Sequence, residues 1–227
     1  MDIFNLIKII TAALTVIISF TVGFRVFRLN PGNLLNKWFT LFFISSSLGF
    51  LTYTFYHLIL NNSQIIIPMM ITAQIFFNFI CISLMMTVFI LEKYEKVAMS
   101  LKYLGSMMLL FFIMSVGYFI WTPELDMVRY AQDIVDTNTP PEWFIFITLV
   151  RTALSIYVVY KYALITRKIG EETKKRVQWF FIGIIFAVIG MFINLMGGFL
   201  RSITIEIFAL IAIDIATIAI FKGFLIK

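Results

Sequence analysis

The chain has 227 residues, of which 61% are hydrophobic and 13% charged, and its mean hydropathy is +0.98. A soluble domain is about half apolar and one quarter charged, so this composition excludes a protein whose surface lies mostly in water. The formal net charge is +6. The basic residues fall in short segments between apolar blocks, which indicates membrane orientation and no nucleic-acid partner.

The apolar residues form blocks of about 20 residues, which span a roughly 30 Å hydrocarbon core when each is an α-helix. Backbone groups in hydrocarbon must be hydrogen-bonded internally, which favours helices, and the blocks lack the alternation of barrel strands. We predict an all-α membrane protein, with one transmembrane domain over residues 1–227 that is a bundle of seven helices. In chain order the helices span about 4–24, 38–60, 67–91, 102–121, 143–163, 176–199 and 202–221.

Lys and Arg are distributed unevenly between the two sets of connecting segments. Fourteen lie in the first, third and fifth connectors and the C-terminal tail, whereas Lys8, Arg129 and Arg201 lie on the opposite side. Cytoplasmic loops carry the basic excess, so we predict a multi-pass protein of the cell membrane with its N-terminus outside and its C-terminus in the cytoplasm. The fifth connector is a candidate surface for a cytoplasmic partner or anionic lipid. Its basic residues are Arg167, Lys168, Lys174, Lys175 and Arg176.

The fourth connector, about 122–142, is the longest and carries five acidic residues against one arginine. Between its prolines, residues 125–135 can form a short helix over the outer mouth of the bundle. Two interpretations stay open, an acidic solvated loop and a lid over a pocket.

Three ionisable residues lie at membrane depth, where a charge is costly and therefore a functional hypothesis. Arg151 is near the middle of the fifth helix. On the seventh, Asp214 is slightly below the middle and Glu206 is about one turn below the outer surface. Arg151 can form a buried ion pair with Asp214 or with Glu206, which would fix helix register. Alternatively, its planar guanidinium binds an anionic or carbonyl group of a ligand.

Weaker polar residues lie at similar depths in the outer half. Gln74 and Asn78, four residues apart, share a face of the third helix. His57 is near the outer end of the second helix, and Asn194 is in the outer part of the sixth. If these faces converge, they form a polar cavity with Arg151 at its floor and Glu206 on its wall. Hydrogen bonding between helices explains each amide equally well.

The residues that catalysis would need are missing. The chain has one histidine and one cysteine, His57 and Cys81, which excludes His-cluster or cysteine metal sites and an internal disulfide. No nucleophile motif or phosphate-binding glycine loop is present, and Lys222 is too close to the inner end to hold retinal. We therefore predict a protein that is not an enzyme and binds no metal or cofactor.

Four stretches resemble a known family. They are RLNPGNLLNK at Arg28–Lys37, FILEKYEK closing the third helix, RKIGEETKKRVQWFFIG entering the sixth, and the ending IAIFKGFLIK. Together they are similar to the seven-transmembrane N-terminal sensor region of prokaryotic histidine kinases and related signalling proteins. That resemblance implies sensing at the membrane and relay to a cytoplasmic output domain. This chain stops about six residues after the seventh helix, so we expect the output to be a separate protein or the module to act alone.

Three functions fit these features. The first is a receptor-like sensory module that detects a small molecule or membrane signal in an outward pocket and relays it to a cytoplasmic partner. The second is a small-solute transporter or transport subunit, although no helix has a Gly/Pro break at mid-depth. The third is a non-catalytic scaffold or assembly subunit. The partner of Arg151 discriminates them, because an ion pair with Asp214 favours packing and an open cavity favours binding or transport.

Overall fold

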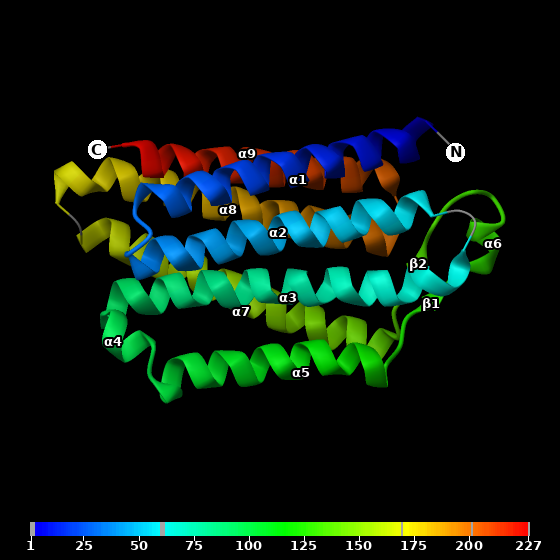
Figure 1. Cartoon of the computed structure of the whole chain (residues 1–227), viewed down its shortest axis with the longest axis horizontal. Helices are drawn as coiled ribbons and strands as arrows, with labels where there is room; N and C mark the ends of the chain where they lie inside the picture. The colour runs from blue at the N-terminus through cyan, green and yellow to red at the C-terminus, as the bar shows by residue number, and fades with distance from the viewer. Residues whose placement is uncertain (1–2, 60–61, 169, 201, 227) are drawn as a thin grey trace.

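The computed structural model describes residues 3–59, 62–168, 170–200 and 202–226. Long helices run antiparallel and side by side (Figure 1). We call the end with the N-terminus and the two short strands the hairpin end, and the opposite end, which holds the C-terminus and α4, the basic end. The elements are α1 (Ile3–Leu29), α2 (Leu34–Leu58), α3 (Ser63–Lys93), α4 (Glu95–Ala98), the π-helical turn η1 (Leu101–Gly105), α5 (Ser106–Ile120), β1 (Glu124–Leu125), α6 (Met127–Tyr130), β2 (Thr137–Asn138), α7 (Pro141–Lys168), α8 (Glu171–Leu200) and α9 (Ile203–Leu225).

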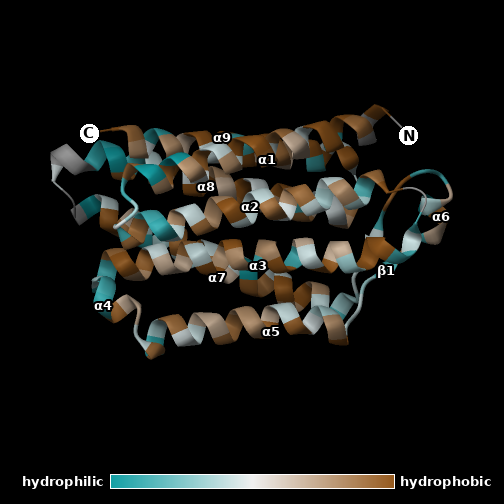
Figure 2. Ribbon diagram, viewed as in Figure 1, coloured by the Kyte–Doolittle hydropathy of each residue, from teal (hydrophilic) through white to brown (hydrophobic). Residues whose placement is uncertain are grey.

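Seven segments of the described chain are long and apolar enough to cross a membrane, which agrees with the seven helices predicted from the sequence. Six of them lie in α1, α2, α3, α7, α8 and α9, and the seventh consists of η1 and the α5 helix that continues it. Hydrophobic residues predominate along the middle of these helices, and hydrophilic residues are more frequent towards their ends (Figure 2). The chain is therefore an all-α bundle that fits a multi-pass membrane protein.

Most helices extend beyond the predicted ends. α1 continues to Leu29 rather than ending near residue 24, and α7 continues to Lys168 rather than 163. The apolar pattern marks only the part that fits hydrocarbon, whereas helix formers such as Arg continue the helix into the interface. α3 begins at Ser63, four residues early, because the side-chain oxygen of Asn62 accepts a hydrogen bond from the backbone N–H of Gln64 at 3.2 Å.

The helices pack around two large apolar clusters and two smaller ones. α1 lies against α2 and α9, α3 contacts α2, α5 and α7, and α8 contacts α9 and α7. The cluster in the basic half includes eight fully buried side chains, and a second large cluster in the hairpin half surrounds Trp143. The basic half is thus filled by packed side chains, which include Val26, Phe39, Phe43, Val88, Val158, Tyr162, Ile184 and Ile220.

Glycines at seven-residue spacing allow α8 and α9 to approach closely. A Cβ at Gly183 would lie 2.8 Å from the backbone oxygen of Ala216, and one at Gly190 would lie 3.0 Å from that of Ala209. Small residues at helix contacts allow such close packing in a membrane. Gly183 and Gly190 therefore serve the close packing of α8 against α9.

Gly183→Ala is expected to lower the unfolding midpoint in lipid nanodiscs, because its methyl group must push α9 away. Overpacking of this kind costs about 1–3 kcal/mol. Gly198→Ala on the same helix is the matched control, because a Cβ there meets no atom within 4 Å. That control should be neutral or slightly stabilising, since alanine favours a helix over glycine. Equal midpoints for the two variants would contradict the close packing.

The fourth connector forms a small hairpin. β1 pairs antiparallel with β2 through Leu125 and Thr137. The helix inside it, α6, is a single turn and so is shorter than the predicted 125–135 helix. Asp126 caps this turn by accepting hydrogen bonds from two backbone N–H groups at 3.1 Å, and Arg129 Nη1 donates to Asp136 Oδ2 at 2.9 Å. These contacts fix a compact hairpin over the end of the bundle.

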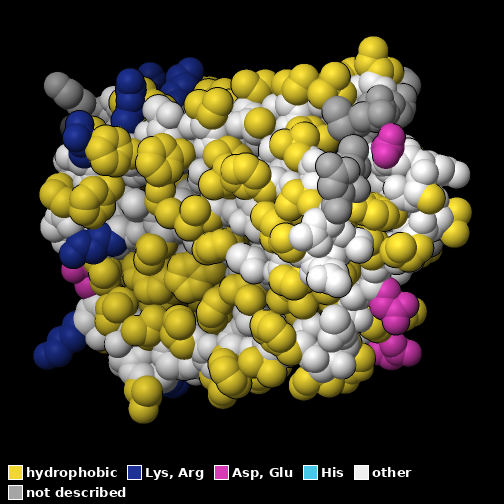
Figure 3. Space-filling model, turned by 45° about the vertical axis from the view of Figure 1, so that its right-hand side comes forward, with side chains coloured by type: hydrophobic (Ala, Val, Ile, Leu, Met, Phe, Trp, Pro, Cys, Tyr) yellow, Lys and Arg dark blue, Asp and Glu magenta, His cyan; other side chains and the backbone are white. Residues whose placement is uncertain are grey.

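Charge divides the two ends of the molecule. In Figure 3 the Lys and Arg side chains gather towards the basic end, and most of the visible acidic ones lie towards the hairpin end. Apolar side chains cover most of the visible face between the two ends. This is the arrangement of a helix bundle that places its apolar band in hydrocarbon and its two charged ends in water.

Candidate functional site

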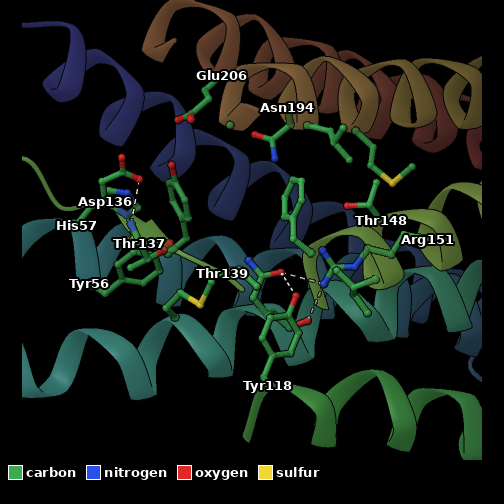
Figure 4. Close-up of a pocket in the computed structure, with 18 of the residues that line it drawn as sticks. Tyr56, His57, Tyr118, Asp136, Thr137, Thr139, Thr148, Arg151, Asn194 and Glu206 are labelled. Atoms are coloured by element: carbon green, nitrogen blue, oxygen red, sulfur yellow. Dashed lines mark hydrogen bonds between the residues drawn. The ribbon is translucent and has the colours of Figure 1, made fainter. Parts of the chain in front are cut away.

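A polar cavity of about 230 Å³ opens in the hairpin half of the bundle. Residues from α1, α2, α3, α5, α7, α8 and α9 line it, together with β2 and its flanking residues. In Figure 4, Asn194 and Glu206 lie on one side of the space, and Arg151 and Tyr118 lie on the other. Five of the candidate residues predicted from the sequence line this cavity, namely His57, Gln74, Arg151, Asn194 and Glu206. The sixth, Asn78, does not line it but is hydrogen-bonded to Arg151.

Arg151 on α7 is held by amides of α3. Its Nε donates to Asn78 Oδ1 at 3.0 Å, and its Nη2 lies 2.6 Å from the same oxygen and 2.9 Å from Gln74 Oε1. Tyr118 Oη also donates to Gln74 Oε1, and Asn78, which is 0% exposed, donates from Nδ2 to the carbonyl oxygen of Met114. The network links α3, α5 and α7, and it orients the guanidinium towards the cavity that it lines.

Arg151 forms neither of its two candidate ion pairs, with Asp214 or with Glu206, in the described part of the chain. Every hydrogen bond that Arg151 makes goes to a neutral oxygen of Gln74 or Asn78, and no described carboxylate forms an ion pair with it. Asp214 does not line this cavity, and its Oδ1 is buried without a hydrogen-bond partner among the described residues. The physical reason is helix order, because α7 packs on α3 whereas α9 packs on α1 and α8.

Glu206 forms an ion pair with Lys8, which the sequence analysis considered only as one of the three basic residues on the outer side. Lys8 Nζ lies 2.6 Å from Glu206 Oε2, and the same ammonium lies 5.3 Å from the ring centroid of Tyr53. Lys8 is only 7% exposed. The pair joins α1 to α9 beside the cavity, so Glu206 is on the wall as predicted, but its charge is already compensated. The position of Lys8 inside the first apolar block could have indicated from the sequence that it needs a buried acidic partner.

His57 and Asn194 differ in how they contribute. His57 is 4% exposed, and its Nδ1 donates to the carbonyl oxygen of Tyr53 at 2.9 Å, while its ring contacts those of Tyr53 and Tyr56. It is a packed wall residue. Asn194 lines the cavity and is exposed to it, and among the described residues no hydrogen bond satisfies its amide. Asn194 is therefore available to a ligand.

The hairpin contributes residues that the sequence interpretation did not assign to the site. Asp136, Thr137 and Thr139 line the cavity, and Val135 is buried among aromatic residues of the hairpin half. Asp136 is paired with Arg129 at 2.9 Å. The lid interpretation is thus compatible with the geometry. Other missed lining residues are Tyr53, Tyr56, Tyr118, Thr148 and Thr152, whose types are too common in membrane helices to stand out.

The five candidate docking residues lie far from the cavity, around the connection of α7 and α8 at the basic end. Arg167 and Lys175 are exposed, and Lys174 is partly buried. The guanidinium of Arg176 lies 5.7 Å from the ring centroids of Phe180 and Phe224. The side chain of Lys168 lies outside the described residues. Any coupling between cavity and basic end must therefore pass along the helices.

Among the described residues, no group of three His, Cys, Asp or Glu side chains is placed to hold a metal ion. No protein-family model matches the chain, and comparison with curated proteins found no match. The geometry of the cavity is therefore the basis for a functional assignment. Its distinctive feature is a guanidinium that lines a polar cavity and has only neutral hydrogen-bond partners.

Proposed function

We propose that this protein is a receptor-like module of the cell membrane that binds a small molecule in an outward-facing pocket and relays the event to a cytoplasmic partner. In this proposal the hairpin end and N-terminus face outside, and the basic end and C-terminus face the cytoplasm. The observation that carries it is Arg151, a cation at membrane depth that lines a cavity and lacks a described carboxylate partner. Such a residue marks a binding site by default.

The pairing of charged side chains around the cavity favours a ligand that carries a negative charge or strong hydrogen-bond acceptors. Lys8 is paired with Glu206 and Asp136 with Arg129, at 2.6 and 2.9 Å. Arg151 is the remaining charged residue among the described lining, and its amide partners do not neutralise it. An acceptor that entered the cavity would offset the cost of holding a cation away from water.

Packing in the basic half favours a binding module over a transporter. In the basic half of the bundle, Phe43, Val88, Tyr162 and Ile184 are 0% exposed. Tyr162 Oη and Thr87 Oγ1 are hydrogen-bonded there at 2.9 Å. A blind pocket above a filled core fits a site that is occupied and emptied from one side. Ligand binding would then favour one of two helix arrangements, and the cytoplasmic partner would recognise the change in conformation at the basic end.

The proposed orientation can be tested with single cysteines in a Cys81→Ser background. Thr139→Cys, at a residue that follows β2 and lines the cavity, should react with a membrane-impermeant maleimide added outside intact cells. Lys175→Cys should react only after the cells are permeabilised. The reverse pattern would contradict an outward pocket. If both positions react outside, the helix number in the membrane differs from seven.

The relay can be tested by purification in mild detergent followed by mass spectrometry. A stoichiometric cytoplasmic signalling protein is expected, and replacement of Arg167, Lys174 and Lys175 by glutamine should release it, since these residues carry charge at the basic end. Recovery of transport components instead would favour the transporter, and recovery of the chain alone would favour the scaffold.

A further inference from the structure

A second cavity of about 200 Å³ continues from the polar one into the interior of the bundle. The two cavities share part of their lining, including Arg151, Gln74 and Asn194. Beyond that junction the walls are almost entirely apolar. They are formed by α2, α3, α8 and α9 through side chains that include Phe50, Phe77, Ile80, Leu84, Val188 and Leu210. We call this second space the apolar chamber.

Arg151 lies at the junction of the two spaces. Its Nε and Nη2 bond to the amides of α3, whereas its Nη1 makes no hydrogen bond to any described residue. A guanidinium binds carboxylates strongly because its planar donors match the two oxygens of the anion. Glu206 does not compete for it, since Glu206 is paired with Lys8.

The combination of a cation and an apolar chamber restricts the class of ligand. A compact, strongly hydrated anion would leave the apolar chamber empty, and a purely apolar molecule would leave Arg151 without a counter-charge. Ligand sites commonly join a mostly apolar wall to a few placed polar groups, and this pair of cavities has that form. A ligand with an apolar body and one anionic group would satisfy both parts.

We propose that the pocket binds an amphiphilic carboxylate, with its anionic group against Arg151 and its hydrocarbon part in the apolar chamber. The proposal rests on the proposed ligand-binding function and specifies the ligand of the same site. A carboxylate dissolved in the outer water and a fatty acid from the bilayer share this chemistry. Each buried methylene would contribute about 0.8 kcal/mol of hydrophobic free energy.

Cys81 supplies a probe, because it is the only cysteine of the chain and lines the apolar chamber. The full chain in zwitterionic nanodiscs would be treated with N-ethylmaleimide, and modification would be followed by mass spectrometry. Octanoate is expected to slow the modification of Cys81. Octanol, which lacks the charge, and butyrate, which is too short to fill the chamber, should protect much less. Octanoate should also raise the unfolding midpoint by ligand linkage, a readout that does not depend on the reactivity of Cys81.

Two variants remove the two halves of the proposed site. Arg151→Gln keeps a polar side chain but loses the charge, and the octanoate concentration needed for protection should rise about tenfold or more. Ala187→Phe fills the apolar chamber, which Ala187 lines, and should abolish stabilisation by octanoate while Arg151 stays in place. Ala153→Phe is the matched control, because Ala153 is exposed and lines neither cavity.

The outcomes separate this proposal from the proposed function. Equal effects of octanol and octanoate that survive Arg151→Gln would mean simple partitioning into lipid and would overturn the amphiphilic carboxylate. Stabilisation by butyrate as strong as that by octanoate would also overturn it, although an outward anion pocket would stand. A fatty acid that co-purifies with the chain would identify the bilayer as the source, whereas an empty chain that responds to added octanoate would identify a dissolved ligand.

Discussion

Glu206→Gln is expected to lower the unfolding midpoint in nanodiscs more than Lys8→Gln does, although the two residues form one ion pair. Their charged atoms are 2.6 Å apart, and Lys8 is only 7% exposed. Removal of one partner of a buried pair leaves an uncompensated charge and costs about 3–5 kcal/mol. Both single variants should therefore be measurably less stable than the wild type.

The expected asymmetry follows from helix ends. Glu206 is in the first turn of α9, where the helix dipole favours a negative charge, so it tolerates the loss of Lys8. Lys8 lies near the N-terminus of α1, where a positive charge is unfavourable, and without Glu206 its described contact is the ring of Tyr53 at 5.3 Å. Lys8 alone is thus the more costly residue to leave unpaired.

A double-mutant cycle measures this pair. Lys8→Met combined with Glu206→Met leaves no charge behind, so the double variant should be more stable than at least the Glu206→Met single variant. The Lys161–Glu92 pair, with 2.8 Å between Nζ and Oε1 in the basic half, serves as the comparison. Additive losses at Lys8 and Glu206, or a larger loss for Lys8→Gln than for Glu206→Gln, would contradict the role assigned to the pair.

The number of helices could be predicted because the length of an apolar block is set by the bilayer, a constraint that acts on each segment separately. The helix ends were harder to predict from the sequence, because they depend on local contacts. The Asn62 cap starts α3 at Ser63, and Arg25 and Arg28 continue α1 past the apolar block. The hairpin of the fourth connector was not predicted, since a two-residue strand pair leaves almost no pattern in the sequence.

The position of each polar residue along its helix could be read from the sequence, and Arg151, Gln74 and Asn194, expected in the same half of the bundle, line one cavity. Pairing could not be predicted, because it depends on which helices are neighbours and how each is rotated. Asp214 lies at a depth close to that of Arg151 but on α9, which packs against α1 and α8. The i, i+4 spacing of Gln74 and Asn78 was the better signal, since both amides bond the guanidinium.

Asn78→Asp is expected to abolish the binding of anions at Arg151 without unfolding the protein. Asn78 Oδ1 already lies 2.6 Å from Arg151 Nη2 and 3.0 Å from Nε, so an aspartate of the same shape would form a charge-assisted pair in place. That internal carboxylate would occupy and neutralise the cation that a ligand needs. The substitution also replaces the donor Asn78 Nδ2 with a carboxylate oxygen that faces the carbonyl oxygen of Met114, which costs about 3 kcal/mol in this buried position. The new ion pair with Arg151 is expected to offset that cost.

Asn194→Asp is the matched control, because it places the same charge on the wall of the same cavity at a residue that makes no hydrogen bond to Arg151. It should weaken octanoate binding only modestly, through repulsion at longer range. Binding and the unfolding midpoint would be measured for both variants in zwitterionic nanodiscs. Equal weakening by the two variants would mean that any negative charge in the cavity excludes the ligand. Full binding by Asn78→Asp would mean that the ligand does not use Arg151 at all.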